Sequence, residues 1–345
     1  MTIMSRPWIA LDPQIVAANA RAWRAFAGVP VRAVVKADGY GWGSAALVNA
    51  LEGEVASFCV SDEAELRDLR RYTAAPAIVL GDVPLARLER VLRAGAGANI
   101  GTAAELDVAE RHARRLGDAL RVRVGLRLAA GWSGLSPAAL RAFTPILARA
   151  GAHVEVWSHV SDWEHRSIQA RLFRAAVQRL RSANVRVVDT DFASTFPLAA
   201  DGAQGSHVRV GIGLFGATGG HPVSGVRCAL RVVAPVTGVE YVPSALPVGY
   251  GARTVPSGST LATARLGYAD GLPQGLAGTG DILSVGMQYV IAHASRLDAT
   301  RSHLIFLDET TDLDAFAAQA GCSPHELVTA LGNAASANAA RRRPR

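Results

Sequence analysis

Strand-like and helix-like segments alternate along the first two-thirds of the chain, and this alternation restricts the possible folds more than any other feature. Short apolar runs are each followed by a segment with helical periodicity, such as residues 164–183. Eight such alternations favour an α/β fold of the (β/α)8 barrel type over a doubly wound open sheet. The expected strands are 31–36, 57–60, 77–81, 98–100, 121–128, 153–160, 186–194 and 207–215.

The pattern changes near residue 226, where strand-like segments follow one another with turns between them and no helix is expected before Leu313. We therefore expect a barrel domain over residues 12–225 and a smaller, mainly β C-terminal domain over residues 226–345. A short apolar strand within residues 1–11 lies outside the barrel count, and we assign it to the β domain. The strands expected in that domain are 231–233, 236–241, 260–266, 282–285 and 289–292.

Composition and charge argue against several classes of protein. Hydrophobic residues make up 50% of the chain, yet no uninterrupted apolar window of membrane-spanning length occurs, so we expect a cytoplasmic protein with no membrane partner. The net charge of +7 comes from arginines mixed with acids, and only residues 341–345 form a basic cluster, so nucleic acid is not an expected partner. The 3 cysteines are far apart and form no CxxC motif, which argues against disulfides and structural zinc.

A lysine stands where the apolar run 31–35 gives way to a glycine-rich turn, within the segment 34–43 (VVKADGYGWG). Gly39, Gly41 and Gly43 supply the backbone freedom that would let main-chain N–H groups close around an anion. A lysine in such a pocket loses hydration, so its pKa falls and the neutral amine needed for a Schiff base becomes accessible. Taken alone, Lys36 fits equally well as a surface lysine whose stem covers a strand end.

Other polar residues fall at the ends of the expected strands. Lys36, Arg127, His159 and Ser194 end the first, fifth, sixth and seventh strands, and Arg209 lies in the eighth. In a barrel, the carboxyl ends of the strands form one rim, where active sites lie. Any one of these residues alone is more often structural, but several on one rim indicate a functional site.

Five segments of the chain, in the same order, resemble those of alanine racemase and its relatives, the fold-type III enzymes that use pyridoxal 5′-phosphate. The resemblance extends over nearly the whole chain. The first segment is specific, and its occurrence together with the other four argues against chance. The segments are 33–43 (AVVKADGYGWG), 157–159 (WSH), 207–216 (HVRVGIGLFG), 248–251 (VGYG) and 266–271 (LGYADG).

This resemblance implies an amino-acid racemase in which Lys36 forms the Schiff base and serves one face of the substrate, while Tyr250 is the base on the other face. It also implies a homodimer, because the Tyr250 domain of one subunit completes the site of the other. Arg209 would face the pyridine nitrogen, where a permanent cation weakens the electron sink and favours rapid reprotonation. His159, hydrogen-bonded towards Arg209, would supply with it the cationic surroundings that a tyrosine base needs. The cofactor phosphate would be held by Tyr40, Ser194 and the main chain of Gly211 and Ile212.

The segment after the fifth strand departs from the family pattern. Most of these racemases carry a lysine there and, seven residues later, an arginine that contacts the cofactor's phenolic oxygen. The corresponding residues here are Arg127 and Gly134. We hypothesise that Arg127 takes over this contact as a fixed cation, without a carbamylated lysine.

The substrate side departs as well. The resemblance places Tyr268, Met287, Gln288 and Asn333 around the substrate, with Gln288 in place of an acid and Asn333 in place of a tyrosine. The arginine that often follows the Tyr-Ala-Asp-Gly motif is absent. A wider, less charged pocket predicts that serine or a similar polar amino acid is handled at least as well as alanine. The alternative is surface drift in a diverged alanine racemase.

Two other functions remain open at this point. One is a different reaction on the same cofactor, such as decarboxylation, dehydration or retro-aldol cleavage, which the missing phenolic-oxygen arginine allows. The other is a non-catalytic cofactor-binding protein, although such a protein would lack the β domain with Tyr250. Both alternatives make Tyr250 superfluous, so racemisation is favoured. No metal is expected, because Cys322 and His325 flank an apparent helix start and no third ligand stands out.

Overall fold

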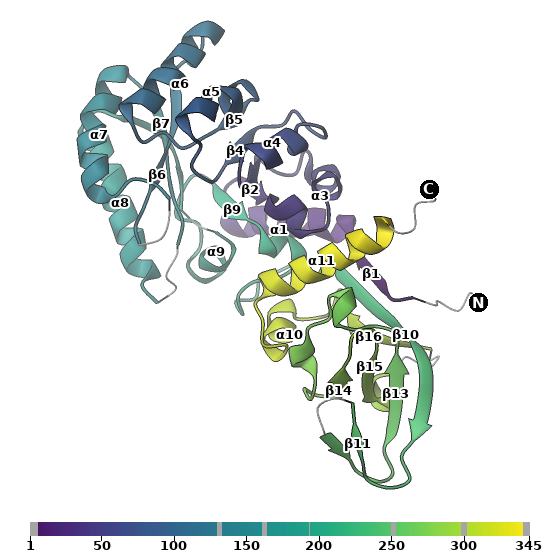
Figure 1. Cartoon of the computed structure of the whole chain (residues 1–345). Coiled ribbons are helices and arrows are strands. Elements are labelled where there is room, and N and C mark those ends of the chain that lie inside the picture. The colour runs from purple at the N-terminus through teal and green to yellow at the C-terminus, as the bar shows by residue number, and fades with distance from the viewer. Residues whose placement is uncertain are drawn as a thin grey trace.

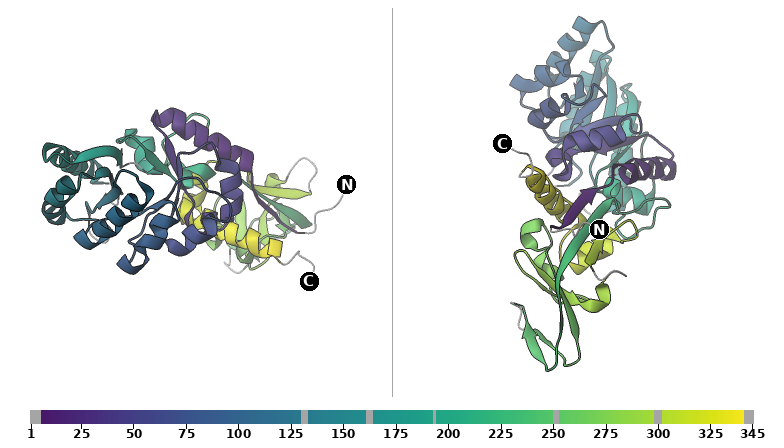
Figure 2. Two further views of the ribbon diagram at one scale, coloured as in Figure 1. Left: turned by 90° about the horizontal axis from the view of Figure 1, so that it is seen from above. Right: turned by 90° about the vertical axis from the view of Figure 1, so that its right-hand side faces the viewer.

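The computed structural model describes residues 6–129, 133–160, 164–192, 194–249, 253–297 and 302–340. It has two lobes of different architecture (Figure 1). In one lobe the strands are enclosed by helices, and the other is built mainly of strands. The long helix α11 (Pro324–Ala340) lies between the two lobes in each view (Figures 1 and 2). Within the described ranges, no helix has the length and apolar character needed to cross a membrane.

Eight parallel strands form the first lobe, as the alternation in the sequence predicts. They pair as a five-stranded sheet in the order β5-β4-β3-β2-β9 and a three-stranded sheet in the order β6-β7-β8. Parallel bridges from Asn99 to Arg123 and from Asp191 to His207 join the two sheets and close the barrel. The fourth strand lies two residues before the expected position. The strands are β2 (Val31–Val34), β3 (Ser57–Val60), β4 (Ala77–Val79), β5 (Ala96–Gly97), β6 (Arg121–Leu126), β7 (His153–Ser158), β8 (Arg186–Asp191) and β9 (Val208–Val210).

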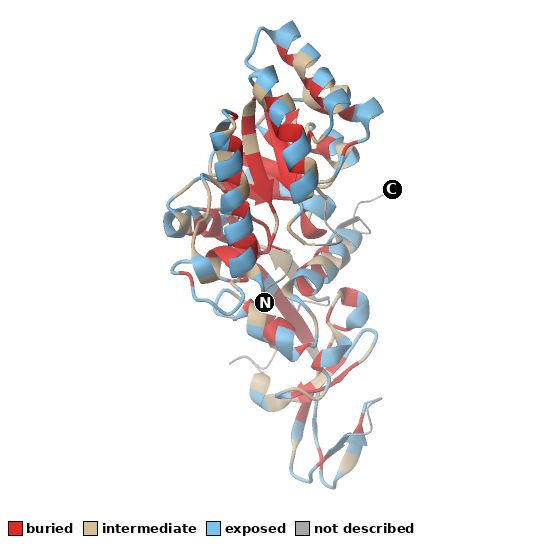
Figure 3. Cartoon of the chain, turned by 90° about the vertical axis from the view of Figure 1, so that its left-hand side faces the viewer, coloured by how far each residue is buried: buried red, intermediate tan, exposed pale blue. Residues whose placement is uncertain are grey.

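Helices cover the outside of the barrel with their apolar faces inward and their polar faces exposed (Figure 3). The helix α6 illustrates the local signals: Thr102 and Glu105 form a capping box at its start, and Gly117 ends it at φ 70°. The helices of this lobe are α1 (Pro13–Ala27), α2 (Lys36–Tyr40), α3 (Ser44–Leu51), α4 (Glu63–Leu69), α5 (Leu85–Arg93), α6 (Ala103–Leu116), α7 (Pro137–Ala150), α8 (Arg166–Ser182), α9 (Thr195–Asp201) and the 3-10 helix η1 (Ile212–Phe215).

Ion pairs occupy part of the barrel interior, where branched aliphatic side chains are usual. Asp191 on β8 is fully buried, and its carboxylate lies 2.7 Å from Arg209, 2.9 Å from Arg32 and 3.4 Å from Arg123. Glu155 on β7 also pairs with Arg32 and Arg123. Because a buried charge is tolerated only where it is paired, this network ties five strands together, namely β2, β6, β7, β8 and β9.

The second lobe is organised around the long strand β10 (Leu230–Tyr241). Its first half pairs with β1 (Trp8–Leu11) and β16, and its second half pairs with β13. The N-terminal strand β1 therefore pairs with β10 in the sheet of the second lobe, and among the described residues the first α-helix after β10 begins at Leu313. We propose that the boundary between the barrel domain and the β domain lies near residue 225, between η1 and β10. The remaining elements are β11 (Leu246–Val248), β12 (Arg253–Val255), β13 (Thr260–Ala264), β14 (Ile282–Val285), β15 (Val290–His293), β16 (His303–Leu307), the 3-10 helices η2 (Tyr268–Asp270), η3 (Gln274–Leu276) and η4 (Ala294–Arg296), and α10 (Leu313–Gln319).

Candidate active site

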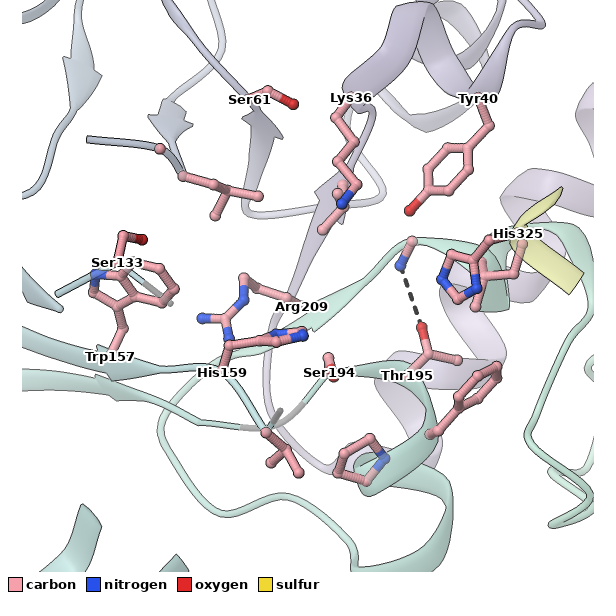
Figure 4. A pocket seen from close by; sticks show the side chains of 18 residues that line it. Lys36, Tyr40, Ser61, Ser133, Trp157, His159, Ser194, Thr195, Arg209 and His325 are labelled. Carbon is pink, nitrogen blue, oxygen red and sulfur yellow. Dashed lines mark hydrogen bonds between the residues drawn. The ribbon is translucent and has the colours of Figure 1, made fainter. Parts of the chain in front are cut away.

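A cavity of about 620 Å³ opens at the carboxyl ends of the barrel strands. Figure 4 shows Lys36 and Tyr40 entering it from one side, with Arg209 and His159 opposite. Ser194 also lines it, so four of the five predicted strand-end residues meet there, and Arg127 is the exception. Side chains from different strands therefore converge on one cavity at this rim, which makes it the candidate site.

Lys36 is presented by an unusual backbone turn directly after β2. Ala37, Asp38, Gly39 and Tyr40 all have positive φ, at 55°, 49°, 62° and 56°, so the chain makes one turn of left-handed helix. Such a conformation is costly for residues with a Cβ and persists only where surrounding contacts impose it. The turn directs both Lys36 and Tyr40 into the cavity (Figure 4).

Side-chain hydrogen bonds hold this turn. The Ala37 N–H donates to Glu65 over 2.7 Å, and the Ser44 N–H donates to Asp38 over 2.7 Å. The expectation that the glycine N–H groups of this turn surround an anion is wrong. The N–H groups of Gly39, Gly41 and Gly43 donate to carbonyl oxygens of the same segment over 3.0, 2.8 and 2.9 Å, so they are already used.

An anion cradle lies instead across the cavity, at the end of β9. A Cβ added to Gly211 would stand 2.2 Å from the Tyr40 hydroxyl oxygen, so only glycine allows the phenol to lie over this backbone. The Thr195 hydroxyl accepts hydrogen bonds from the N–H groups of Gly211, at 3.3 Å, and Gly213, at 3.4 Å. Ile212 lines the cavity beside them. Burial raises the pKa of the Tyr40 phenol well above its usual range, so its hydroxyl keeps the proton it donates.

Arg209 lies on the barrel side of the cavity and is almost fully buried. Its guanidinium donates to the Ser158 carbonyl over 2.6 Å, pairs with Asp191 and lies 5.0 Å from the centre of the Trp157 ring. These contacts fix a permanent cation at the base of the site.

His159 is neutral at neutral pH. Burial, followed by the charges of Arg209, Lys36 and His325, lowers the pKa of His159 to about 3. The expectation that His159 adds positive charge is therefore wrong for this site, because that charge comes from Arg209. A neutral imidazole can still accept or donate a hydrogen bond.

Arg127 does not enter the cavity. It follows the end of β6 and is exposed, and within the described part of this segment Ser133 reaches the cavity instead. An arginine at position 134 is excluded by packing, because a Cβ on Gly134 would stand 2.8 Å from the Gly125 carbonyl at φ 108°. The described structure therefore offers neither Arg127 nor residue 134 as the contact to the phenolic oxygen.

The expected substrate residues lie outside their own chain's cavity. Tyr268 and Met287 are 41% and 57% exposed on the β domain, and Gln288 is exposed beside them. Asn333 is also exposed and packs against Gly41 behind the lysine turn. The second base, Tyr250, lies outside the described residues. Sites shared between subunits would require this placement.

Sequence reasoning missed several residues that line the cavity. Thr195 stands one residue beyond the predicted Ser194, and its hydroxyl, rather than that of Ser194, bonds the Gly211 N–H. Trp157 was part of a recognised segment but received no role. The ring of His325 enters from α11, far along the chain, and no local pattern indicated it.

The cavity fits a phosphorylated pyridine aldehyde. Lys36 offers an amine, Arg209 a cation for the ring nitrogen, and the Tyr40 hydroxyl at the Tyr40–Gly211 cradle a donor for a phosphate, while no carboxylate occurs among the lining residues that are described. Only glycine at position 211 leaves space for the Tyr40 hydroxyl. The cradle is therefore formed by the fold itself.

A (β/α)8 barrel with this lysine, this cradle and an appended β domain defines the class of barrel enzymes that hold pyridoxal phosphate on a lysine. The model of the alanine racemase N-terminal domain matches residues 11–219, and that of the alanine racemase C-terminal domain matches residues 229–338. The chain therefore belongs to the alanine racemase family, a family of isomerases that depend on pyridoxal phosphate.

Comparison with individual alanine racemases extends this finding. The alanine racemase of Cereibacter sphaeroides is 30% identical over 368 residues, covering 95% of this chain and 97% of the relative. That of Desulfosudis oleivorans is 29% identical over 321 residues, covering 85% and 82%. Among solved structures, alanine racemase from Bartonella henselae with covalently bound pyridoxal phosphate has a TM-score of 0.78 at 22% identity, covering 96% and 98%. Alanine racemase from Acinetobacter baumannii has a TM-score of 0.81 at 16% identity, covering 95% and 98%. These structures support the fold.

Proposed function

We propose that this protein is a pyridoxal-phosphate-dependent racemase that interconverts L- and D-forms of a small or polar amino acid. One observation carries the proposal. Lys36 and Arg209 face each other across a cavity whose end is the Tyr40–Gly211 cradle, which is the arrangement that this cofactor requires.

When bound, pyridoxal phosphate withdraws electrons from the substrate's Cα and makes its proton acidic. The residues of the chain then divide the work. The Lys36 Nζ accepts or returns the proton on one face, and the Tyr250 hydroxyl of the partner subunit serves the other face. Arg209 would place a full positive charge beside the ring nitrogen and would so limit the stabilisation of the withdrawn electron pair, which would favour rapid return of a proton.

The homodimer is part of the proposal. Tyr268, Met287 and Tyr289 form an exposed patch on the β domain, of 41%, 57% and 47% exposure, away from their own cavity. Apolar and aromatic side chains gathered in this way are typical of surfaces that meet a partner. A second copy of the chain would cover the patch and receive these residues at its own cavity.

A mixing experiment tests the shared site. Lys36→Ala and Tyr250→Phe variants should each be inactive, and subunit exchange between them should restore about a quarter of wild-type activity, since half the dimers would hold one intact site. If exchange is confirmed but no activity returns, Lys36 and Tyr250 do not act across the dimer.

The candidate substrates are alanine and a larger polar amino acid such as serine. Gln288 in place of an acid supports serine, because an uncharged and wider pocket admits a hydroxylated side chain. A chiral assay over a panel of L-amino acids, run on protein with the absorbance of lysine-bound cofactor, measures this directly. A strong preference for alanine would rule out the serine assignment.

One observation favours a second reaction on the same cofactor. Gly134 is packed against Gly125, so the phenolic-oxygen arginine cannot be supplied from that position. Decarboxylation, dehydration or retro-aldol products in the same panel would support this alternative, and loss of Tyr250 would then leave turnover largely intact.

A further inference from the structure

Arg265 contacts two turns of the β domain that carry the expected substrate residues. It directly follows β13, and its N–H donates to the Pro235 carbonyl on β10 over 2.9 Å, so the sheet fixes its backbone. The first turn spans residues 267–271, and the second spans residues 286–289 between β14 and β15. Neither turn belongs to a strand, so their relative position depends on contacts other than strand pairing. The expected substrate residues on these turns are Tyr268, Met287 and Gln288.

The backbones of the two turns lie directly against each other. The Tyr268 N–H donates to the Gly286 carbonyl and the Ala269 N–H to the Met287 carbonyl, each over 3.0 Å. A Cβ added to Gly267 would stand 2.4 Å from the Gly286 carbonyl oxygen, so the two turns approach as closely as a glycine allows. The side chains that these turns present are therefore placed as one set.

The Arg265 side chain bridges the two turns. Its Nη1 donates to the Asp270 carboxylate over 2.9 Å and to the Gln288 carbonyl over 3.0 Å. The guanidinium carbon also lies 5.7 Å from the centre of the Tyr289 ring, within the range of a cation–π contact. Asp270 is buried, and its carboxylate accepts the Gly267 N–H over 3.1 Å. One guanidinium thus ties both turns to the same buried carboxylate.

The pair of Arg265 and Asp270 is largely shielded from water. Their side chains are 24% and 9% exposed, so solvent and salt screen the attraction less than on an open surface. Among the described residues, Arg265 is the only cation within ion-pair distance of Asp270. An uncharged side chain at position 265 would leave that buried carboxylate poorly satisfied and would remove the bridge to Gln288.

We propose that Arg265 is a positioning residue for the substrate, because it holds the turns 267–271 and 286–289 in the arrangement in which they cover the substrate in the partner subunit's cavity. This inference rests on the proposed function, and on the homodimer in particular. The Arg265 guanidinium is already engaged by Asp270 and Gln288, so it acts through the turns rather than by touching the substrate.

Steady-state kinetics of the holoenzyme give the first test. Arg265→Met keeps the bulk of the side chain but removes its charge and donors, and should raise KM for the amino acid about threefold to tenfold, the loss of roughly one hydrogen bond. The value of kcat and the absorbance of the bound cofactor should stay unchanged, because the barrel holds the cofactor. Arg265→Lys keeps a cation beside Asp270 and should recover part of the loss. The matched control is Arg296→Met, which removes a similar ring contact in the same domain, 5.5 Å from the Phe306 centre, and should leave KM unaltered.

Two heterodimers, each purified through a different tag on each chain, separate positioning across the dimer from a general loss of stability. In the first, one chain carries Lys36→Ala and the other Arg265→Met, so the active cavity is covered by turns with an intact Arg265, and KM should equal that of the wild type. In the second, one chain carries both substitutions beside a wild-type chain, so the active cavity is covered by the altered turns, and KM should be raised. Both heterodimers contain the same two substitutions, so a general weakening of the fold would affect them equally.

Hydrogen exchange provides a readout besides activity. In Arg265→Met, the N–H groups of Gly267 and Ala269 should exchange faster than in the wild type, whereas Arg296→Met should leave them unchanged. Unchanged exchange, an unchanged KM, or equal KM values in the two heterodimers would overturn the inference. If Arg265→Met fails to fold, Arg265→Lys replaces it in every arm, with the same direction and a smaller effect. A wild type that racemises no amino acid would refute the proposed function itself, whereas a racemase whose KM ignores Arg265 would refute this inference alone.

Discussion

Replacing Asp191 with asparagine should destabilise the barrel by about 3–5 kcal/mol, the loss expected when one partner of a buried ion pair is removed. Asp191 is 0% exposed, and it is the carboxylate that faces Arg209, at 2.7 Å. Arg32 and Arg123 keep Glu155 as a partner in the variant. Arg209 keeps only neutral contacts such as the Ser158 carbonyl, so its charge is left buried without a counter-charge.

Urea unfolding followed by circular dichroism and tryptophan fluorescence measures this loss, and coincident transitions would justify a single free energy. The control is Glu309→Gln. Glu309 pairs with Arg227 over the same 2.7 Å, but both side chains are about half exposed, so removing that pair should cost about 0–1 kcal/mol.

The double variant Asp191→Asn with Arg209→Gln gives the decisive comparison. Removing both charges leaves no orphan cation, so the double variant should lose clearly less than the sum of the two single losses. Additive losses, or a single-variant loss as small as that of Glu309→Gln, would refute the reasoning that Asp191 holds the charge balance of the site.

Three further outcomes follow from local geometry. Gly211→Ala should abolish cofactor binding measured by absorbance, because the new Cβ meets the Tyr40 hydroxyl. Adding Tyr40→Phe should restore part of the binding. If no binding is restored, the close approach of Tyr40 to Gly211 does not explain the loss. Gly134→Arg should lower the unfolding midpoint in urea without changing the cofactor's spectrum, whereas a stable variant with an altered spectrum would show that the position can admit the family's arginine. The pKa of His159 is about 3 in the folded protein and 6.5 in the unfolded chain. As the pH falls, His159 therefore takes up a proton in the unfolded chain before it does so in the folded protein. The stability of the cofactor-free protein should thus decrease as the pH drops from about 6.5 to 3. His159→Gln should flatten that part of the stability profile, and an unchanged profile would place the acid sensitivity elsewhere.

The barrel could be predicted because each strand–helix alternation is a local signal. The eight barrel strands were found, with the fourth lying two residues before its expected position, and the N-terminal strand pairs with β10. The left-handed turn at 37–40 could not be foreseen, since Ala37, Asp38 and Tyr40 have no intrinsic preference for positive φ. Contacts from distant elements impose it, through Glu65 on α4 and through α11. Tertiary contacts here override local propensity.

The site was predictable only to the level of strand ends. The periodicity of a strand tells which residues reach the rim, but not which direction a side chain takes after the strand has ended. Arg127 was expected in the cavity but is exposed outside it. Thr195, one residue past the expected Ser194, accepts the hydrogen bond from the Gly211 N–H. The ion pairs of Asp191 depend on the register between neighbouring strands, which the sequence does not display.

The charges of the cavity determine where the bases for proton transfer can come from. Its described lining includes Lys36, His159, Arg209 and His325 but no aspartate or glutamate. The acids Asp191 and Glu155 lie deeper in the barrel and are occupied by arginines.

Among the described barrel residues, no carboxylate is therefore placed to serve as the base, and Arg209 holds its proton permanently. Within the described cavity, Lys36 is the group placed to move a proton at the substrate. Racemisation needs a donor on each face of a planar carbon, and we propose that the second donor is Tyr250 of a partner subunit. The exposed patch around Tyr268 and Met287 belongs to the same domain as Tyr250, so the charge distribution supports the proposal of a shared dimeric site.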